Sequence, residues 1–250
     1  NLQPHWKTKL FTKFLAPSEN YVYKKDINSS LHAWQNFSTA YFHPADLHNL
    51  SIKQFNPFLC IPQGVIQSTV AHLELDETKE LIAFIPGVGK HRPHRAWPLQ
   101  NWLSLFKILE TRENQKYQIV LVGGPDEVDL CDELILQLPN ISKNRLINLA
   151  GKLNLLGTAA ILSKASVVIG SDTGPTHIAG ALGKKVIGLY GPTSATRHAP
   201  FTGISVEADD YTCAETCTSK KCARKVMTCM NAIKPEEVWL LMKELQTTNS

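Results

Sequence analysis

A strand–loop–helix–strand unit in the C-terminal half is the feature that most restricts the fold. Val167–Ile169 is a short apolar, β-branched run bounded by a glycine, which predicts a buried strand. Pro175 is expected to open a helix, and Gly183 to close it with a left-handed cap. Lys185–Tyr190 then predicts the next strand. Such a unit indicates a parallel sheet in an α/β fold.

The loop of this unit, Ser171–Gly174, carries the predicted binding site. In a parallel sheet it lies at the carboxyl edge, where open α/β sheets bind ligands. It leads into a helix N-terminus, whose free N–H groups suit an anion such as a pyrophosphate. Asp172 would supply a carboxylate for sugar hydroxyls, and His177 lies just inside the helix. The alternative is that Asp172 or Thr173 only caps the helix, but so many chemically active residues in one loop favour a site.

This loop belongs to a series of motifs along the chain. In order they are Pro86-Gly87, Arg95-Ala96-Trp97-Pro98, Val122–Glu127, Leu149-Ala150-Gly151, Asp172–His177, Gly188–Thr193, Cys229-Met230 and Ile233–Val238. Together they resemble the signature of glycosyltransferase family 9, the heptosyltransferases of lipopolysaccharide assembly. The resemblance covers roughly residues 80 to 245, and several motifs in order are more specific than any one alone.

The resemblance implies a GT-B architecture, in which two Rossmann-like domains face each other across a cleft. Each domain is α/β, with helices on both faces of a parallel sheet. We expect residues 76–250 to form the C-terminal nucleotide-sugar-binding domain, and residues 1–75 to be the remainder of the N-terminal acceptor-side domain and a linker. In the family a strand and loop at the start of the chain supply the general base. The catalytic base is therefore expected in an N-terminal segment that is not present here, and stays unassigned.

A basic loop follows the predicted strand Leu81–Ile85. The resemblance implies a lysine just before the Trp-Pro pair that meets the donor phosphates, and Arg95 stands in that place, with one more residue between it and Pro86-Gly87. Arginine can clamp a phosphate bidentately, and Lys90 or Arg92 can share the task. A solvated basic loop is the alternative, but so many cationic groups beside a strand end favour phosphate contact.

Glu127 follows the predicted strand Gln118–Val122 and two glycines. The resemblance implies that its carboxylate accepts the ribose hydroxyls, and it also suits the first turn of a helix over Val128–Leu138. No Asp-x-Asp motif stands in a suitable loop, so we expect transfer without a metal or another cofactor. The predicted donor-binding residues are Lys90, Arg95, Glu127, Asp172, Thr173, Gly174 and His177.

The remaining elements follow from hydrophobic periodicity and turn residues. Helices are predicted over Leu99–Thr111 and Leu155–Ser163 and from Pro235 onward, and short strands over Arg145–Leu149 and Ile204–Val206.

Composition is that of a globular protein: of 250 residues, 43% are hydrophobic and 19% charged. No apolar run approaches the ~20 residues of a membrane span, and no signal peptide is visible, so we expect a cytoplasmic protein. The net charge of +4 is mild, and no nucleic-acid-binding module is present. Leu10, Phe11, Phe14 and Leu15 follow a helical pattern. That helix is either an ordinary surface helix or a peripheral contact with the inner face of the bacterial inner membrane.

Four cysteines, Cys213, Cys217, Cys222 and Cys229, follow the spacing C-x3-C-x4-C-x6-C. The spacing permits a zinc site but lacks the paired C-x2-C of strong zinc motifs, so reduced, packed thiols are favoured. We expect the isolated Cys60 and Cys131 to be small buried hydrophobic residues.

The resemblance implies transfer of a heptose or related sugar from a nucleoside-diphosphate sugar, with ADP favoured, to a lipid-linked saccharide of the lipopolysaccharide inner core. Two alternatives stay open. One is a nucleotide-sugar-binding module without catalysis of its own, from a truncated or degenerate member of the family. The other is a GT-B-like epimerase or hydrolase of sugar nucleotides.

Overall fold

The structure is a computed structural model, which describes residues 59–113, 116–138, 145–200, 202–208, 222 and 228–247. Almost all of these residues belong to one compact unit, Pro57–Ala195 with Ala199–Ser250. Within these ranges no helix has the length and apolar character needed to cross a membrane.

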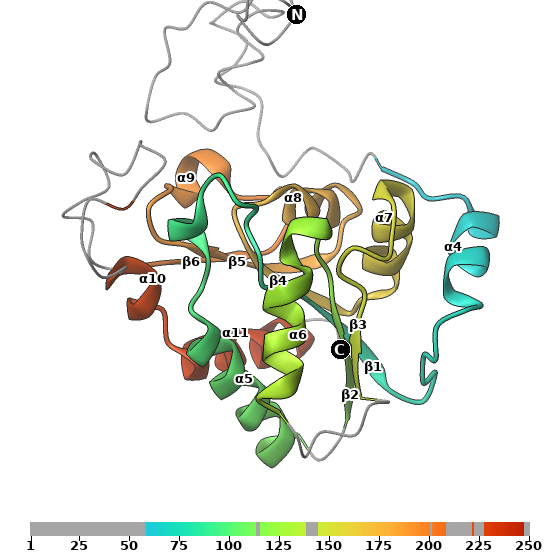
Figure 1. Cartoon of the computed structure of the whole chain (residues 1–250), viewed down its shortest axis with the longest axis horizontal. Coiled ribbons are helices and arrows are strands. Elements are labelled where there is room, and N and C mark those ends of the chain that lie inside the picture. Colours follow the sequence, from blue (N-terminus) through green and yellow to red (C-terminus); the bar gives the residue numbers. More distant parts are fainter. Residues whose placement is uncertain are drawn as a thin grey trace, which may run out of the picture. The chain divides into compact units, whose positions relative to one another are not determined.

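A six-stranded parallel sheet forms the centre of this unit (Figure 1). Its strands are β1 (Glu80–Ile85), β2 (Tyr117–Leu121), β3 (Leu146–Asn148), β4 (Val167–Ser171), β5 (Lys185–Tyr190) and β6 (Ile204–Glu207). The strand order is β3-β2-β1-β4-β5-β6, so successive strands are added to one side of β1 and then to the other. The order reverses between β1 and β4, where Ile85 pairs with Gly170. The predicted parallel α/β sheet is confirmed.

Helices connect the strands. They are α4 (Gln63–Val70), α5 (Leu99–Arg112), α6 (Val128–Leu136), α7 (Leu155–Lys164), α8 (Gly174–Ala181), α9 (Ala195–His198), α10 (Thr228–Ala232) and α11 (Pro235–Thr247), with 3-10 turns η2 (Pro93–Arg95) and η3 (Pro125–Glu127). Figure 1 shows them on both faces of the sheet.

Each face of the sheet buries its own apolar core. On β1, Ile82 and Phe84 point into a core shared with α5, α6 and α11. The alternate residues Leu81, Ala83 and Ile85 point into a second core with α7, α8 and the partly buried side chains of α4 and its connection to β1. Both faces of the strands are therefore apolar, as is typical of parallel sheets covered by helices.

The predicted elements are present, with small shifts at their ends. β4 continues through Ser171, which was expected in the loop, because Ser171 still pairs with Leu189 of β5. The left-handed cap of α8 is confirmed, since Gly183 has a φ of 71°. Helix α4 was not predicted.

Residues 59–75 pack against the sheet unit. The Leu59 amide donates to the Ala181 carbonyl at 3.2 Å, and Ile66 is buried. The domain boundary at residue 75 stays a prediction, and the amphipathic helix at residues 10–15 lies outside the described residues. Cys131 is buried as expected, whereas the expectation for Cys60 is wrong, because it lies exposed in the irregular stretch before α4.

Candidate functional site

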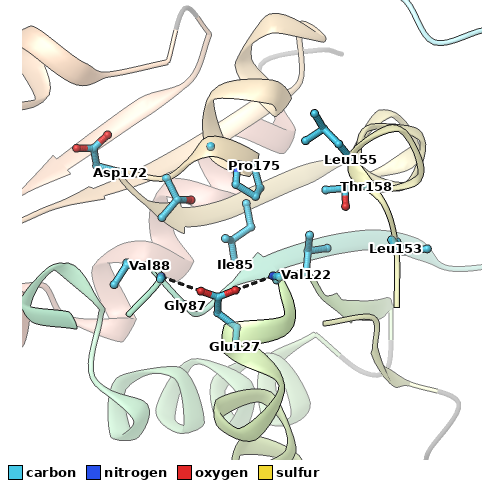
Figure 2. Close-up of a pocket in the computed structure, with 15 residues that line it drawn as sticks. Ile85, Gly87, Val88, Val122, Glu127, Leu153, Leu155, Thr158, Asp172 and Pro175 are labelled. Carbon is cyan, nitrogen blue, oxygen red and sulfur yellow. Dashed lines mark hydrogen bonds between the residues drawn. The ribbon is translucent and has the colours of Figure 1, made fainter. Parts of the chain in front are cut away.

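A pocket of about 500 Å³ opens at the carboxyl edge of the sheet (Figure 2). It lies at the switch between β1 and β4, the position where open α/β sheets bind ligands. Three loops line it: Gly87–Gly89 after β1, Gly123–Glu127 after β2, and Asp172–Pro175 after β4. The start of α7 closes the remaining side.

Glu127 lies on the floor of this pocket, between two loops (Figure 2). Its Oε1 accepts a hydrogen bond from the Gly89 amide at 2.7 Å, and its Oε2 accepts one from the Gly124 amide at 2.6 Å. The carboxylate thus joins the loop after β1 to the loop after β2. Each of its oxygens keeps a second lone pair, so the ribose contact that the resemblance implies stays a prediction.

Asp172 lies at the other side of the pocket and brings two donors together. Its Oδ2 is 2.8 Å from Nη1 of Arg95, and its Oδ1 is 3.1 Å from Nε2 of His177. The side chains of Arg95 and Asp172 are only 17% and 10% exposed, whereas that of His177 is 43% exposed. Arg95 Nε is buried and has no hydrogen-bond partner within the described part of the chain.

Burial is the main influence on the basic groups of this region. It lowers the pKa of Arg95, while the carboxylate of Asp172 opposes that change; a guanidinium stays charged in proteins all the same. His94 is only 3% exposed, and its pKa is lowered by burial and then by the charges of Arg95 and Arg92. Neither of its ring nitrogens has a partner among the described residues. The surroundings of His94 therefore disfavour its charged form.

The N-terminus of α8 opens toward the pocket, because Gly174 and Pro175 line it. Thr173 is the N-cap residue, yet its side chain makes no capping hydrogen bond. Its Oγ1 lies 3.1 Å from Oγ1 of Thr176, which donates to the carbonyl of Ser171 at 2.7 Å. The first-turn amides of such a helix, which lack intrahelical acceptors, suit an anionic ligand.

An apolar wall faces these polar groups. Leu153, Leu155 and Thr158 line the pocket at the start of α7, and Leu155 is 71% exposed. Sequence reasoning placed Leu155 only at a helix start. An exposed leucine there gives no signal of a site until the fold places it beside the glycine loops.

The predicted site residues therefore separate into three groups. Glu127, Asp172, Thr173 and Gly174 line the pocket, and Arg95 and His177 contact Asp172. Lys90 lies apart: it is exposed, 3.4 Å from Asp126, and lines a smaller hollow of about 200 Å³ beside the same Gly87–Gly89 loop.

No cluster of His, Cys, Asp and Glu side chains suited to a metal ion occurs among the residues that the structure describes. Cys213 and Cys217 lie outside them, while Cys222 is partly exposed and Cys229 buried. Transfer without a metal stays a prediction.

The comparisons with known proteins agree with one another. The model of glycosyltransferase family 9 (heptosyltransferase) matches residues 10–230. Lipooligosaccharide heptosyltransferase 2 of Haemophilus influenzae is 32% identical over 155 residues, which are 60% of this chain and 44% of that protein. Lipopolysaccharide heptosyltransferase 2 of Escherichia coli is 28% identical over 138 residues, 55% of this chain and 38% of that protein. Lipooligosaccharide heptosyltransferase 2 of Campylobacter jejuni is 26% identical over 97% of this chain and 73% of its own length.

Solved structures show the same fold. The structure of E. coli ADP-heptose lps heptosyltransferase II superposes with a TM-score of 0.73 at 21% identity, over 92% of this chain and 66% of that one. E. coli heptosyltransferase WaaC with ADP superposes with a TM-score of 0.56 at 19% identity, over 89% of this chain and 59% of that one. The matches with the H. influenzae and E. coli relatives span less than half of those proteins. Because the family model matches residues 10–230, which is most of this chain, the chain belongs to glycosyltransferase family 9.

Proposed function

We propose that the protein is a heptosyltransferase that moves a heptose from ADP-heptose to the inner core of lipopolysaccharide. The observation that carries this proposal is the pocket at the β1–β4 switch, in a chain that matches the family model over residues 10–230. Two glycine-rich loops and the N-terminus of α8 meet there, an arrangement that suits a nucleoside diphosphate.

The pocket divides by chemistry in a way that suits such a donor. The diphosphate would lie at the Gly174 end of α8, with Arg95 contributing a positive charge. The ribose would lie over Glu127, and the apolar wall of Leu153 and Leu155 suits the flat face of a base. Asp172 would orient the sugar.

The reaction requires groups beyond this pocket. A base deprotonates the acceptor hydroxyl, which attacks the anomeric carbon of the donor sugar as the bond to the diphosphate breaks. The negative charge on the departing diphosphate is stabilised by Arg95 and the N-terminus of α8, without a metal ion. Lys90 contributes if its side chain moves toward the pocket. The base is proposed to come from an N-terminal domain, and the acceptor to be a lipid-linked saccharide at the inner face of the inner membrane.

The sequence also permits two other activities, a binding module without catalysis and a sugar-nucleotide epimerase or hydrolase. The reported relatives are all named heptosyltransferases, which favours transfer.

Calorimetric titration with ADP, UDP and GDP tests the donor site. We expect ADP to bind best, and Arg95→Ala to weaken ADP binding by about 1.5–3 kcal/mol, the range of a charge-assisted contact. Lys107→Ala, which removes an exposed cation from α5, should leave the affinity unchanged. If folded protein, checked by circular dichroism, binds none of the nucleotides at about 1 mM, the proposal is wrong.

A further inference from the structure

Glu127 does more than line the donor pocket, because its side chain is inserted between two backbones. Its two oxygens accept from the amides of Gly89 and Gly124, at 2.7 Å and 2.6 Å. Figure 2 shows both bonds leaving the carboxylate toward opposite loops. Hydrogen bonds from an N–H to a charged acceptor are among the strongest that a protein makes.

Two neighbouring glycines leave the space that this side chain occupies. A Cβ added to Gly87 would lie 1.9 Å from Cγ of Glu127, and one added to Gly123 would lie 2.8 Å from its Cβ. At Gly87 the three nearest atoms that such a Cβ would meet all belong to Glu127. The absence of a side chain at residue 87 is thus required by the position of Glu127.

The loop held by Glu127 has little else to fix it. Among the described residues, no other hydrogen bond restrains the backbone of residues 87–91. The same loop separates the donor pocket from the smaller hollow beside Lys90, since Gly87, Val88 and Gly89 line both. Its conformation therefore sets the shape of one wall of the donor pocket.

We infer that Glu127 is a positioning residue, which binds the Gly87–Gly89 loop to the loop after β2 and so shapes one wall of the donor pocket. This inference rests on the proposed donor site. It differs from a ribose contact, because the carboxylate then acts through the backbone of the loop and not through the ribose hydroxyls.

Two nucleotides separate these roles. Glu127→Gln keeps the size of the side chain but turns one acceptor into a donor that faces an amide N–H. If Glu127 acts through the loop, this variant should bind ADP and 2′,3′-dideoxy-ADP more weakly by the same factor, about tenfold for one charged hydrogen bond. Asp129→Asn is the matched control, since it neutralises an exposed acid in the first turn of α6, the helix that follows Glu127. It should leave both affinities unchanged.

The steric fit gives an independent test. Gly87→Ala should weaken ADP binding strongly on its own. In the Glu127→Ala background, where Cγ is absent, the same change should have little further effect. Gly64→Ala, at an exposed helix position with open space around it, controls for the substitution itself. The amide resonances of Gly89 and Gly124 should shift in Glu127→Gln and stay in place in Asp129→Asn.

The outcomes separate this inference from the proposed function. If the wild-type protein binds no ADP, the proposed donor site itself is wrong. If the wild-type protein binds ADP, and Glu127→Gln weakens the binding of ADP but not of the dideoxy nucleotide, the positioning role alone is wrong. A Gly87→Ala effect of equal size with and without Glu127 overturns it as well.

Discussion

Arg95 and Asp172 show how a single pair of residues joins two motifs. They are 77 positions apart in sequence, and their charged atoms lie 2.8 Å apart. Both side chains are largely buried, so each charge depends on the other for the interactions that it lost with water. Lys90 and Asp126 form a pair at 3.4 Å in the same region, but both side chains are well exposed. The two pairs differ mainly in burial.

A double-mutant cycle on each pair should reveal that difference. For Arg95→Gln and Asp172→Asn we expect a coupling free energy of unfolding of about 1.5–3 kcal/mol, because each single change removes the charged partner of a largely buried group. For Lys90→Gln and Asp126→Asn we expect about 0–1 kcal/mol, as for exposed pairs. Urea unfolding of the single and double variants gives both values. Equal coupling in the two pairs would contradict the importance of burial.

Helix α8 is the element that the local sequence defines best. Pro175 lies in its first turn, and Gly183 follows its end with a φ of 71°, a conformation in which a Cβ is strained. The chain turns there directly into β5, so the cap sets how α8 packs beside that strand. The amino end of the same helix faces the donor pocket.

Two identical substitutions should therefore have opposite effects. Gly183→Ala should lower the free energy of unfolding by about 1–2 kcal/mol, because alanine resists the left-handed conformation. Gly64→Ala, in α4, should be neutral or stabilise by up to about 1 kcal/mol, since glycine is a poor helix former. Thermal unfolding of the two variants measures this. A destabilisation of similar size at both sites would show that backbone conformation is not the cause.

At the scale of the whole unit, helix α11 is held to the end of α5 through a buried carboxylate. Glu113, after the end of α5, accepts from Nε1 of Trp239 at 2.8 Å and from Nζ of Lys243 at 2.9 Å. Burial alone would raise the pKa of Glu113, but the bonds from Lys243 and Trp239 outweigh it and lower that pKa below the usual 4.5. The ionised form of Glu113 thus stabilises the folded unit.

Glu113→Gln should change how stability depends on pH. A carboxyl group whose pKa is lower in the folded state than in the unfolded state stabilises the fold. This stabilisation is complete above the unfolded pKa and is lost as the pH falls through the folded pKa. We expect the variant to be less stable at pH 7 by about 1.5–3 kcal/mol. The difference from wild type should shrink as the pH falls below the usual pKa of 4.5. A difference that is constant with pH, measured by urea unfolding, would exclude this ionisation as its source.

The sequence allowed the sheet and the β4–α8 loop to be predicted, because β-branched runs, Pro175 and Gly183 act locally. It also placed Glu127 and Asp172 at strand ends. Their partners were not predictable: the Gly89 amide and the Arg95 guanidinium approach them only after β1, β2 and β4 pair. The apolar wall at Leu155 was not predicted, for the same reason. Local patterns predict elements, whereas contacts between distant loops depend on the strand order.

That strand order also determines when the donor pocket comes into being. Ser166 donates to the carbonyl of Leu81 from 85 positions away, and β4 joins the sheet directly beside β1. A chain emerging from the ribosome holds the Gly87 loop long before it holds Asp172, and closing so long a loop is a slow, entropically costly step. Until β4 docks, the pocket lacks Asp172 and the N-terminus of α8. Bound nucleotide would then prolong the life of the folded protein by slowing its unfolding, and would do nothing to hasten its formation.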